Sequence, residues 1–323
     1  STSVNFDKMT SSGNSLYLSG SSGNSPMYRV NLVVGGSGVT TGEATLIEPS
    51  FTNASYYNTG TEVQLSYVGG LATDGTALYV ADGSHKLIRK IDLTTSNIST
   101  LAGKLENYAD GTGVNGEFLH PDKMVRIGTD LYVVDDSRIR KVDSATGAVS
   151  TLQTSGESYN WIERLTTDGT DIYFTSYVSG GSSSGYKLFK LSVADGVVSE
   201  LQTSGGSDNS SSSSNIIGLA SDGTDLFVAR YSYGSGTSGT QVSRIALQTG
   251  TLTSYTTGGV SLSYMSGMEK IGDSLFASSS SSIYEIELSG TSATVSTLSL
   301  SGIDNSTSVN FDKMTSSGNS LYL

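Results

Sequence analysis

The chain has 323 residues, of which 18 are Lys or Arg and 30 are Asp or Glu, so its formal net charge is −12. This acidity disfavours nucleic acid and anionic membrane surfaces as partners, because both are bound mainly through Lys and Arg. No apolar run approaches the roughly 20 residues of a membrane-spanning helix, and the absence of Cys excludes disulfides and thiolate metal sites. We therefore expect no nucleic-acid partner and no membrane insertion.

The chain begins with a segment that returns at its other end. Residues 1–18 read STSVNFDKMTSSGNSLYL, and residues 306–323 repeat all 18 letters. Because the match includes Ser, Thr and Asn that no core would dictate, it indicates a true internal repeat with a period of 305 residues. The first residue is Ser rather than Met, so we expect a piece of a longer polypeptide.

Within this period a shorter repeat is visible. The segment ends in the strand-like Leu16-Tyr17-Leu18, which follows a Gly-Asn turn. The same strand recurs at residues 78–80, 131–133, 172–174, 226–228, 275–277 and 321–323. Six units of about fifty residues therefore complete one period, and the seventh occurrence is the first one again.

The second unit shows most clearly what each unit contains. Strands are predicted over 70–73, 78–82, 87–93 and 98–103, and an Asp-Gly turn separates the first two. No helical periodicity of useful length occurs. Six such units predict an all-β fold, a six-bladed β-propeller of four-stranded antiparallel blades, closed by a terminal strand hairpin.

The third unit carries a family resemblance. Residues 101–152 read LAGKLENYADGTGVNGEFLHPDKMVRIGTDLYVVDDSRIRKVDSATGAVSTL and closely resemble NHL-repeat propellers, whose pattern ends in LYVAD, IRKID and TG.V.TLAG. The second unit is nearly as similar, while the other four keep only the strand and turn skeleton. NHL propellers include RNA-binding domains, protein-interaction modules, sensor domains and an amidating lyase, so the resemblance implies the fold far more than the activity.

Catalytic chemistry finds little support in the residues. The NHL-like lyase binds zinc through several histidines, whereas this chain has only His85 and His120. Asp110, Asn115 and Glu117 are weak calcium candidates, although their loop is also the ordinary structural loop of the family. We expect no enzyme activity and no cofactor. Charged residues on the predicted inner strands, expected to pair with one another, are Lys8, Lys123, Arg126, Glu163, Arg164, Glu269 and Lys270.

Contact surfaces are expected in two places. Loops between the second and third strands, and connections between units, are long and rich in aromatic residues, which fits either binding of a partner or simple capping of the blade edges. The terminal copies are the second place. The expected interface residues are Phe6, Met9, Leu16, Tyr17, Leu18, Phe311, Met314, Leu321, Tyr322 and Leu323 in the copies, and Tyr56, Tyr57, Tyr159, Trp161, Tyr177, Tyr231 and Tyr233 in the loops.

The duplication dictates the functional prediction. One ring, residues 19–305 with a single hairpin, has one place for the first two strands of its first unit, yet residues 1–18 and 306–323 supply two copies. Ordering a chain costs roughly 1–2 kcal/mol per residue, so each copy must pack against something. We expect 306–323 to close the ring or to start a following unit, and 1–18 to belong to a neighbouring ring.

Two functional hypotheses follow. The first is a structural, non-catalytic repeat unit that binds identical neighbours head to tail in an extracellular filament or cell-surface adhesin array. The second is a single propeller that recognises a peptide or glycan on its long-loop face, in which case the duplication is a feature of engineering or cloning.

Overall fold

The structure is a computed structural model. It describes residues 4–12, 15–20, 27–35, 38–47, 65, 67–104, 108–179, 185–202, 204, 214–232, 239–257, 262, 265–279, 282–297, 300–301, 309–311, 315–317 and 320–322. For the strands before residue 48 and after residue 299 only the backbone is described. The described residues contain no helix that is long and apolar enough to cross a membrane.

Strands dominate the described chain. The first half contains β1 (Val4–Ser12), β2 (Ser15–Gly20), β3 (Met27–Gly35), β4 (Gly38–Ile47), β5 (Val68–Thr73), β6 (Ala77–Asp82), β7 (Leu87–Asp92), β8 (Ile98–Gly103), β9 (Gly111–Thr112), the short 3-10 helix η3 (Gly113–Asn115), β10 (Pro121–Ile127), β11 (Asp130–Asp135), β12 (Arg138–Asp143), β13 (Ala148–Thr151) and β14 (Ser155–Gly156). The predicted second-unit strands correspond to β5–β8.

The second half continues the same pattern. It contains β15 (Ile162–Thr167), β16 (Ile172–Val178), β17 (Gly185–Leu191), β18 (Val197–Glu200), β19 (Ser214–Ser221), β20 (Asp225–Ser232), β21 (Gly239–Ala246), β22 (Leu252–Thr256), β23 (Met265–Ile271), β24 (Ser274–Ser279), β25 (Ser282–Ser289), β26 (Ser292–Thr297), β27 (Leu300–Ser301), β28 (Val309–Phe311), β29 (Thr315–Ser317) and β30 (Ser320–Tyr322).

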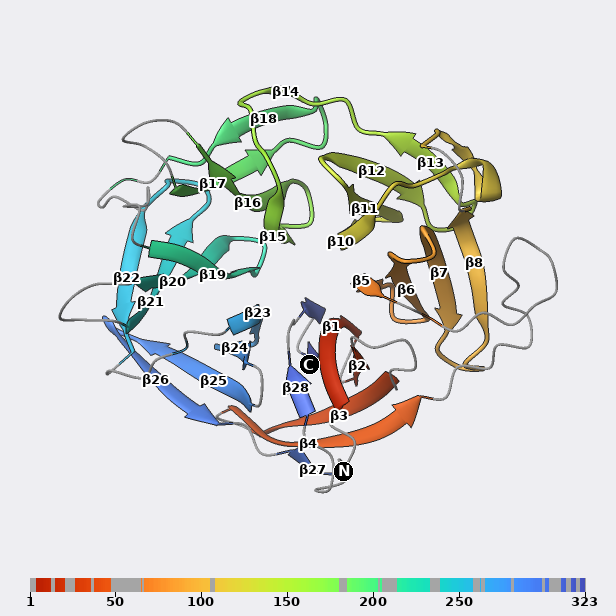
Figure 1. Cartoon of the computed structure of the whole chain (residues 1–323). Coiled ribbons are helices and arrows are strands. Elements are labelled where there is room, and N and C mark those ends of the chain that lie inside the picture. Colours follow the sequence, from red (N-terminus) through yellow and green to blue (C-terminus); the bar gives the residue numbers. More distant parts are fainter. Residues whose placement is uncertain are drawn as a thin grey trace.

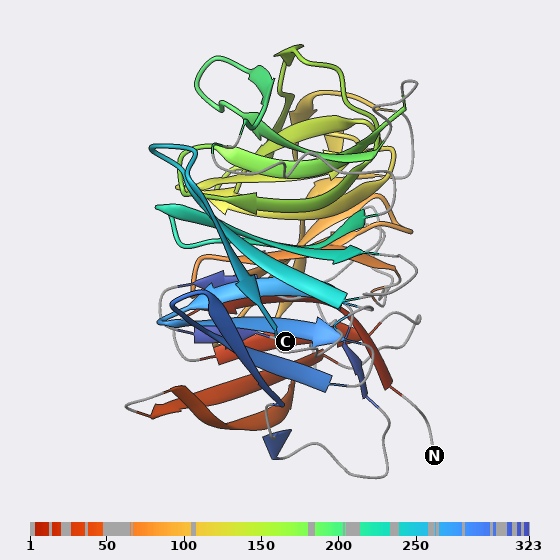
Figure 2. The same ribbon diagram turned by 90° about the vertical axis from the view of Figure 1, so that its left-hand side faces the viewer.

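Six groups of four consecutive strands each form an antiparallel meander, and we call them units one to six. They are β1–β4, β5–β8, β10–β13, β15–β18, β19–β22 and β23–β26. Figure 1 shows them around a central axis, with the first strand of each unit nearest the centre. The side view shows strands running between the two ends of the ring (Figure 2). An all-β, antiparallel architecture is therefore confirmed.

The sheets are not the six separate four-stranded sheets that we predicted. Units five and six are joined in one eight-stranded sheet through the parallel pair Thr256 and Ser292. Units three and four gain a fifth strand, β9 and β14, and unit one becomes six-stranded through β27 and β28. The added strands are short and lie at sheet edges, where an unpaired backbone would otherwise be exposed.

The Asp-Gly turns explain why the first two strands of several units meet. In unit two, Thr76 and Ala77 donate their backbone N–H groups to Asp74 Oδ1, both at 2.8 Å, and Gly75 adopts a φ of 91°. Asp168 and Asp222 accept the same pair of bonds in units four and five. Because a positive φ suits Gly and the Asx bonds fix the turn, the motif predicted from sequence is confirmed locally.

The hydrophobic core lies between units rather than inside them. Tyr79 and Ile88 of unit two pack in one cluster with Phe118, Met124 and Leu131 of the unit that follows. Similar clusters join units three and four, four and five, and five and six. The sheets of units three, four and five therefore bury both faces against their neighbours, which explains the near-continuous apolar runs of their second strands.

The two terminal copies are placed differently. The first copy supplies β1 and β2, which pair antiparallel and continue the sheet through β3. In the second copy, β28 pairs in parallel with β1, while β29 and β30 form a separate two-stranded sheet. β28 lies inside the ring, beside β1 (Figure 1).

This is the arrangement within a single chain, and the expectation that residues 1–18 belong to a neighbouring ring stays a prediction. We expected the ring to hold one copy, completed in unit one by the C-terminal one. In the structure the N-terminal copy completes unit one, and part of the C-terminal copy extends the same sheet by one parallel strand. A ring thus contacts both copies, although only one of them joins the meander.

Candidate interaction surface

We call the end of the ring that carries the loops between second and third strands the loop end, and the end that carries the Asp-Gly turns the turn end. Unit four presents aromatic side chains at the loop end. The segment entering β15 is fixed there because Asn160 donates its backbone N–H to Ser176 Oγ and its side-chain amide to the Tyr177 carbonyl, both at 2.9 Å. These bonds join the entrance of the inner strand to the exit of β16, and they position the residues on either side of Asn160.

Four aromatic residues surround this junction. Tyr159 is partly buried, with its ring 4.9 Å from Phe174 in an edge-on contact. Trp161 is 65% exposed and Tyr177 is 45% exposed, and Tyr177 packs at 5.4 Å against Tyr186. Large apolar groups left in water on a fixed backbone are the feature expected of a contact surface. Trp161, Tyr177 and Tyr186 are called the aromatic surface below.

The other predicted interface residues have different surroundings. Tyr231 packs against the core cluster between units five and six. Phe6, Met9, Leu16, Tyr17, Leu18, Phe311, Leu321 and Tyr322 lie in β1, β2, β28 and β30, where the backbone alone is described. Tyr56, Tyr57, Tyr233, Met314 and Leu323 lie outside the described residues.

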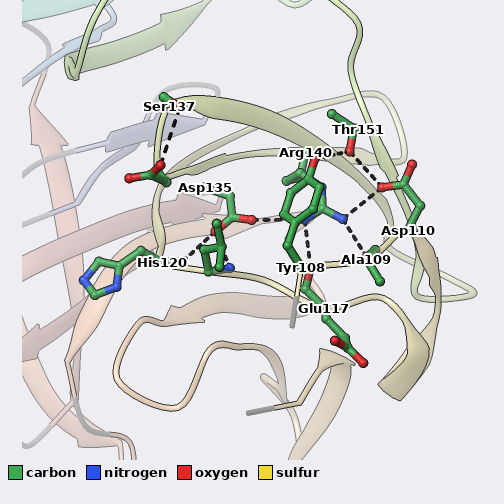
Figure 3. Close-up of polar contacts among 11 residues, drawn as sticks. Tyr108, Ala109, Asp110, Glu117, His120, Asp135, Ser137, Arg140 and Thr151 are labelled. Carbon is green, nitrogen blue, oxygen red and sulfur yellow. Dashed lines mark hydrogen bonds and ion pairs between the residues drawn. The ribbon is translucent and has the colours of Figure 1, made fainter. Parts of the chain in front are cut away.

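A buried polar network lies at the loop end of unit three (Figure 3). Arg140, which has no exposed side-chain surface, donates to Asp135 at 3.0 Å and to Asp110 at 3.0 Å. It also donates to the backbone carbonyls of Glu117 and Ala109, both at 2.8 Å. One guanidinium therefore fastens the connection from unit two onto the third strand of unit three.

The partners of this arginine are themselves held in place. Asp135, also fully buried, accepts the backbone N–H groups of Leu119 at 2.9 Å and His120 at 2.6 Å. The Tyr108 ring stacks on Arg140, 4.2 Å from its guanidinium carbon, and Arg138 lies 4.6 Å from the same ring. Both Nη atoms of Arg140 thus have carboxylate and carbonyl partners, as a buried charge requires, whereas its buried Nε has none.

Unit two contains the corresponding pair. Asp82 and Arg89 are fully buried, with Arg89 Nε 3.4 Å from Asp82 Oδ2, and Arg89 also donates to Thr100 at 2.6 Å. His85 Nδ1 lies 2.8 Å from both oxygens of Asp82. The two units most similar to NHL repeats therefore share one buried acid–arginine pair, and His85 belongs to it.

The calcium candidates are engaged in these structural contacts. Asp110 accepts hydrogen bonds from Arg140 and from Thr151, and Glu117 pairs with Lys104 at 2.9 Å. Asn115 ends the 3-10 helix η3. Among the described residues no group of three or more His, Cys, Asp or Glu side chains is arranged to hold a metal ion. The three residues lie in one loop, and the two carboxylates face cationic side chains.

Three of the charged residues predicted on the inner strands have described hydrogen-bond partners. Lys123 binds its neighbour Asp122 at 2.5 Å, and Lys270 donates to the carbonyl of Gly272. Arg164 donates to the carbonyls of Ile217, Met265 and Glu163 at 3.2, 3.3 and 3.4 Å, and burial lowers the pKa of its guanidinium. Arg164 therefore connects the inner strands of units four, five and six through their backbones.

Sequence reasoning missed the buried acid–arginine pairs. Asp82, Arg89, Asp135 and Arg140 occupy polar positions of alternating strands, and the period-2 pattern assigns such positions to solvent. One signal was available, because both units have Asp as the last residue of the buried second strand and Arg as the third residue of the next strand. The other four units lack this combination.

Comparisons with known proteins bear on the fold. No protein-family model matches the chain, and no curated protein matches it. A chain of the nidogen/laminin complex matches 88% of this chain and 98% of its own length, with 14% identity and a TM-score of 0.57.

Two further structures are less similar. The PQQ-bound aldose sugar dehydrogenase of Streptomyces coelicolor gives 19% identity and a TM-score of 0.47 over 77% of this chain and 84% of its own. An extracellular domain of a hybrid two component system of B. thetaiotaomicron gives 12% identity and a TM-score of 0.47 over 90% of this chain and 34% of its own. Only the nidogen/laminin likeness exceeds a TM-score of 0.5 among these three, and at its identity it shows the fold alone.

The ring of antiparallel sheets and this likeness define the chain as a β-propeller protein. The resemblance of its third unit to NHL repeats stays a prediction.

Proposed function

We propose that the chain is a structural, non-catalytic repeat unit of NHL type, a six-bladed propeller closed by a terminal hairpin. It binds identical units head to tail and forms an extracellular filament or surface adhesin array, without a cofactor. Six consecutive four-stranded meanders support the architecture. The partner in this proposal is the chain itself.

The duplication of residues 1–18 at 306–323 is the observation that carries the proposal. One copy joins the meander of unit one, whereas only Val309–Phe311 of the other pairs with that sheet, and its remaining strands form a two-stranded hairpin. This hairpin lies beside β1, β2 and β23 but shares no backbone pairing with them in the described residues, and a hairpin of two strands is marginally stable by itself. Ordering 18 residues needs an offset on the order of 20–30 kcal/mol, which a neighbouring unit can contribute.

Binding of protein partners has independent support. This chain is similar in fold to a chain of the nidogen/laminin complex, and by analogy we propose that its ring presents a protein-binding surface. The aromatic surface lies at the loop end, and head-to-tail stacking would set it against the turn end of the next ring. The acidic charge of the chain favours a protein partner over nucleic acid.

Electron microscopy and sedimentation of the purified chain test the proposal. We expect filaments or short stacks of rings whose average mass rises with concentration. A chain extended by one further period of 305 residues, which covers two successive rings, is expected to show two adjacent rings along one axis. Rings that stay single at every concentration, together with separated rings in the two-period chain, would contradict the assembly.

A second candidate function is favoured by the exposure of Trp161 and Tyr177. In this alternative a single ring recognises a peptide or a glycan on the aromatic surface, since aromatic rings provide large contact area at small entropic cost. Screening the chain against peptide and glycan arrays tests it. Binding that survives when the chain is monomeric, and that disappears with Trp161→Ser, would favour this function over self-assembly.

A further inference from the structure

The connections into units three, four and five follow one rule. Before a connection enters the inner strand of a unit, it pairs with the outer strand of that same unit. In unit three β9 pairs with β13, in unit four β14 pairs with β18, and in unit five Ser204 pairs with Thr251 beside β22. A connection thus covers the outer edge of a sheet, and the chain then continues into the inner strand of the same sheet.

The chain that leaves unit six follows this rule towards unit one. β27 pairs in parallel with β4, the outer strand of unit one, through Leu300 with Gly42 and Ser301 with Glu43. Val309 follows eight residues after β27, within the range of six residues from β14 to β15 and nine from β9 to β10. The C-terminal copy therefore approaches unit one by the route that delivers the inner strand elsewhere.

Unit one offers two adjacent places for a hairpin. The inner place, next to β3, holds β1 and β2, and the accessory place holds β28 to β30. In the parallel pair, identical residues lie opposite each other, Val4 with Val309 and Asn5 with Asn310. Over these three residues the two copies are thus one strand position apart, about 4.8 Å, in the same direction and register, while β29 and β30 form their own sheet beside them. Because their sequences are identical, either hairpin fits either place.

Two places per ring change the count of copies. If each chain keeps one hairpin in its own ring and donates the other to a neighbouring ring, every ring still receives two hairpins. Both places of every ring are then filled, and no hairpin is left over. The N-terminal hairpin is joined to β3 by seven peptide steps, from Gly20 to Met27, which reach about 25 Å when extended. That reach matches the length of a six-residue strand, about 20 Å, and allows the hairpin to enter an adjacent ring.

We infer that the C-terminal hairpin occupies the inner place of its own ring, and that the N-terminal hairpin then occupies the accessory place of a second copy of this chain. This inference rests on the proposed head-to-tail assembly and names the contact that produces it. The contact is heterologous and does not close on itself, so it propagates along one axis. The structure described above is the unexchanged form of the same pairing.

Cross-linking of the full chain tests the first half of the inference, and the absence of native Cys makes the readout clean. Ser15 lies opposite Asn31 in the unexchanged form, and Ser320 is its counterpart in the second copy. Cross-strand Cα distances of 4.5–5.5 Å suit a disulfide. We expect Ser320→Cys with Asn31→Cys to form a disulfide within one molecule. The control, Leu321→Cys with Asn31→Cys, is out of register by one residue and should not react.

A mixture of single variants tests the second half. Asn5→Cys and Asn310→Cys chains, unfolded and refolded together, are expected to give a disulfide-linked dimer that contains one chain of each kind. Asn5→Cys mixed with Val309→Cys is the control, because neighbouring strand residues point to opposite faces of a sheet. At equal concentration we expect at least a fivefold lower dimer yield from the control mixture.

The outcomes separate this inference from the proposed function. A disulfide between Ser15→Cys and Asn31→Cys, with none between Ser320→Cys and Asn31→Cys, overturns the exchange even if filaments form. No dimer above the control mixture also overturns it. Both cross-links without filaments in the unmodified chain would support the exchange and refute the array. If Asn31→Cys chains do not fold, Val30→Cys with Leu321→Cys asks the same question, since Val30 lies opposite Leu16.

Discussion

The carboxylate of Asp135 lies 3.0 Å from the guanidinium of Arg140, and neither side chain has exposed surface. Removing one member of a buried ion pair leaves the other charge uncompensated, which costs about 3–5 kcal/mol. We therefore expect Arg140→Leu to lower the free energy of unfolding by about that amount, because it also releases the connection that carries Asp110.

Denaturant unfolding measures this effect through the transition midpoint. Arg138→Leu is the matched control, since Arg138 contacts the same Tyr108 ring from a more exposed position. Loss of an exposed cation–π contact is expected to cost about 0.5–1 kcal/mol. Equal destabilisation by the two substitutions would contradict a special role for the buried pair.

A second prediction concerns acid stability at the turn end. Partial burial acts to raise the pKa of Asp74, but hydrogen bonds from the Tyr79 hydroxyl at 2.7 Å and from the turn backbone outweigh it and hold the pKa at about 2, below the ordinary 3.8. Since the folded-state pKa is the lower one, ionised Asp74 stabilises the fold above about pH 4. That contribution, about 1 kcal/mol after allowance for solvent screening, is lost as the pH falls from 3.8 towards 2.

Tyr79→Phe tests the cause of this shift. Unit five has Phe227 at the equivalent position, so the substitution suits the fold, and it removes the hydroxyl donor. We expect the pKa of Asp74 to rise towards 3.8 in a carbon-13 titration of the carboxyl groups, and acid unfolding to begin at higher pH. Tyr132→Phe in unit three is the control and should leave Asp74 unchanged. An unaltered Asp74 titration in Tyr79→Phe would show that the hydrogen bonds within the turn, from the backbone and from the Thr76 hydroxyl, set the pKa.

The turn at Asp74 and the buried pair at Arg140 differ in how far the sequence alone predicts them. The Asp-Gly turn at Asp74 was predictable, because its hydrogen bonds involve residues two and three positions away. The second strands were predictable for a similar reason, since apolar runs report burial on both faces. Contacts of this kind involve residues that are close together in the chain, so the sequence indicates them.

The buried ion pairs and the sheet edges depend on distant residues. Arg140 meets Asp110 across 30 positions, and no local pattern specifies that contact. The pairing of β27 with β4 joins residues more than 250 positions apart, and it was not predicted. The aromatic surface is an intermediate case, because the sequence indicated Trp161 and Tyr177 as loop aromatics but could not show that Asn160, next to Trp161, donates a hydrogen bond to the Tyr177 carbonyl.

A third prediction concerns the contact between units two and three. Gly147 has a φ of 70°, and a Cβ at this position would lie 2.3 Å from the carbonyl oxygen of Leu101 in unit two. Gly147→Ala therefore combines backbone strain with a steric clash, and we expect it to cost about 3 kcal/mol of unfolding free energy. Gly128→Ala has a similar φ of 61° but no atom within 4 Å of the added Cβ, so it should cost about 1 kcal/mol. Equal midpoints in denaturant would contradict a close approach of the two units.

The last prediction uses the single Trp of the chain as a reporter of assembly. Trp161 is 65% exposed, so its emission in the isolated ring should resemble that of indole in water. If head-to-tail stacking covers the aromatic surface, raising the protein concentration should shift the emission to shorter wavelength and reduce quenching by acrylamide. Trp161→Ala should weaken self-association by about 2 kcal/mol, roughly 30-fold, as truncation of a buried interface anchor does. Val197→Ser alters a 42% exposed side chain on the outer strand β18, and it should leave both association and emission unchanged. Assembly without any change in Trp161 emission would place the contact between rings elsewhere than the aromatic surface.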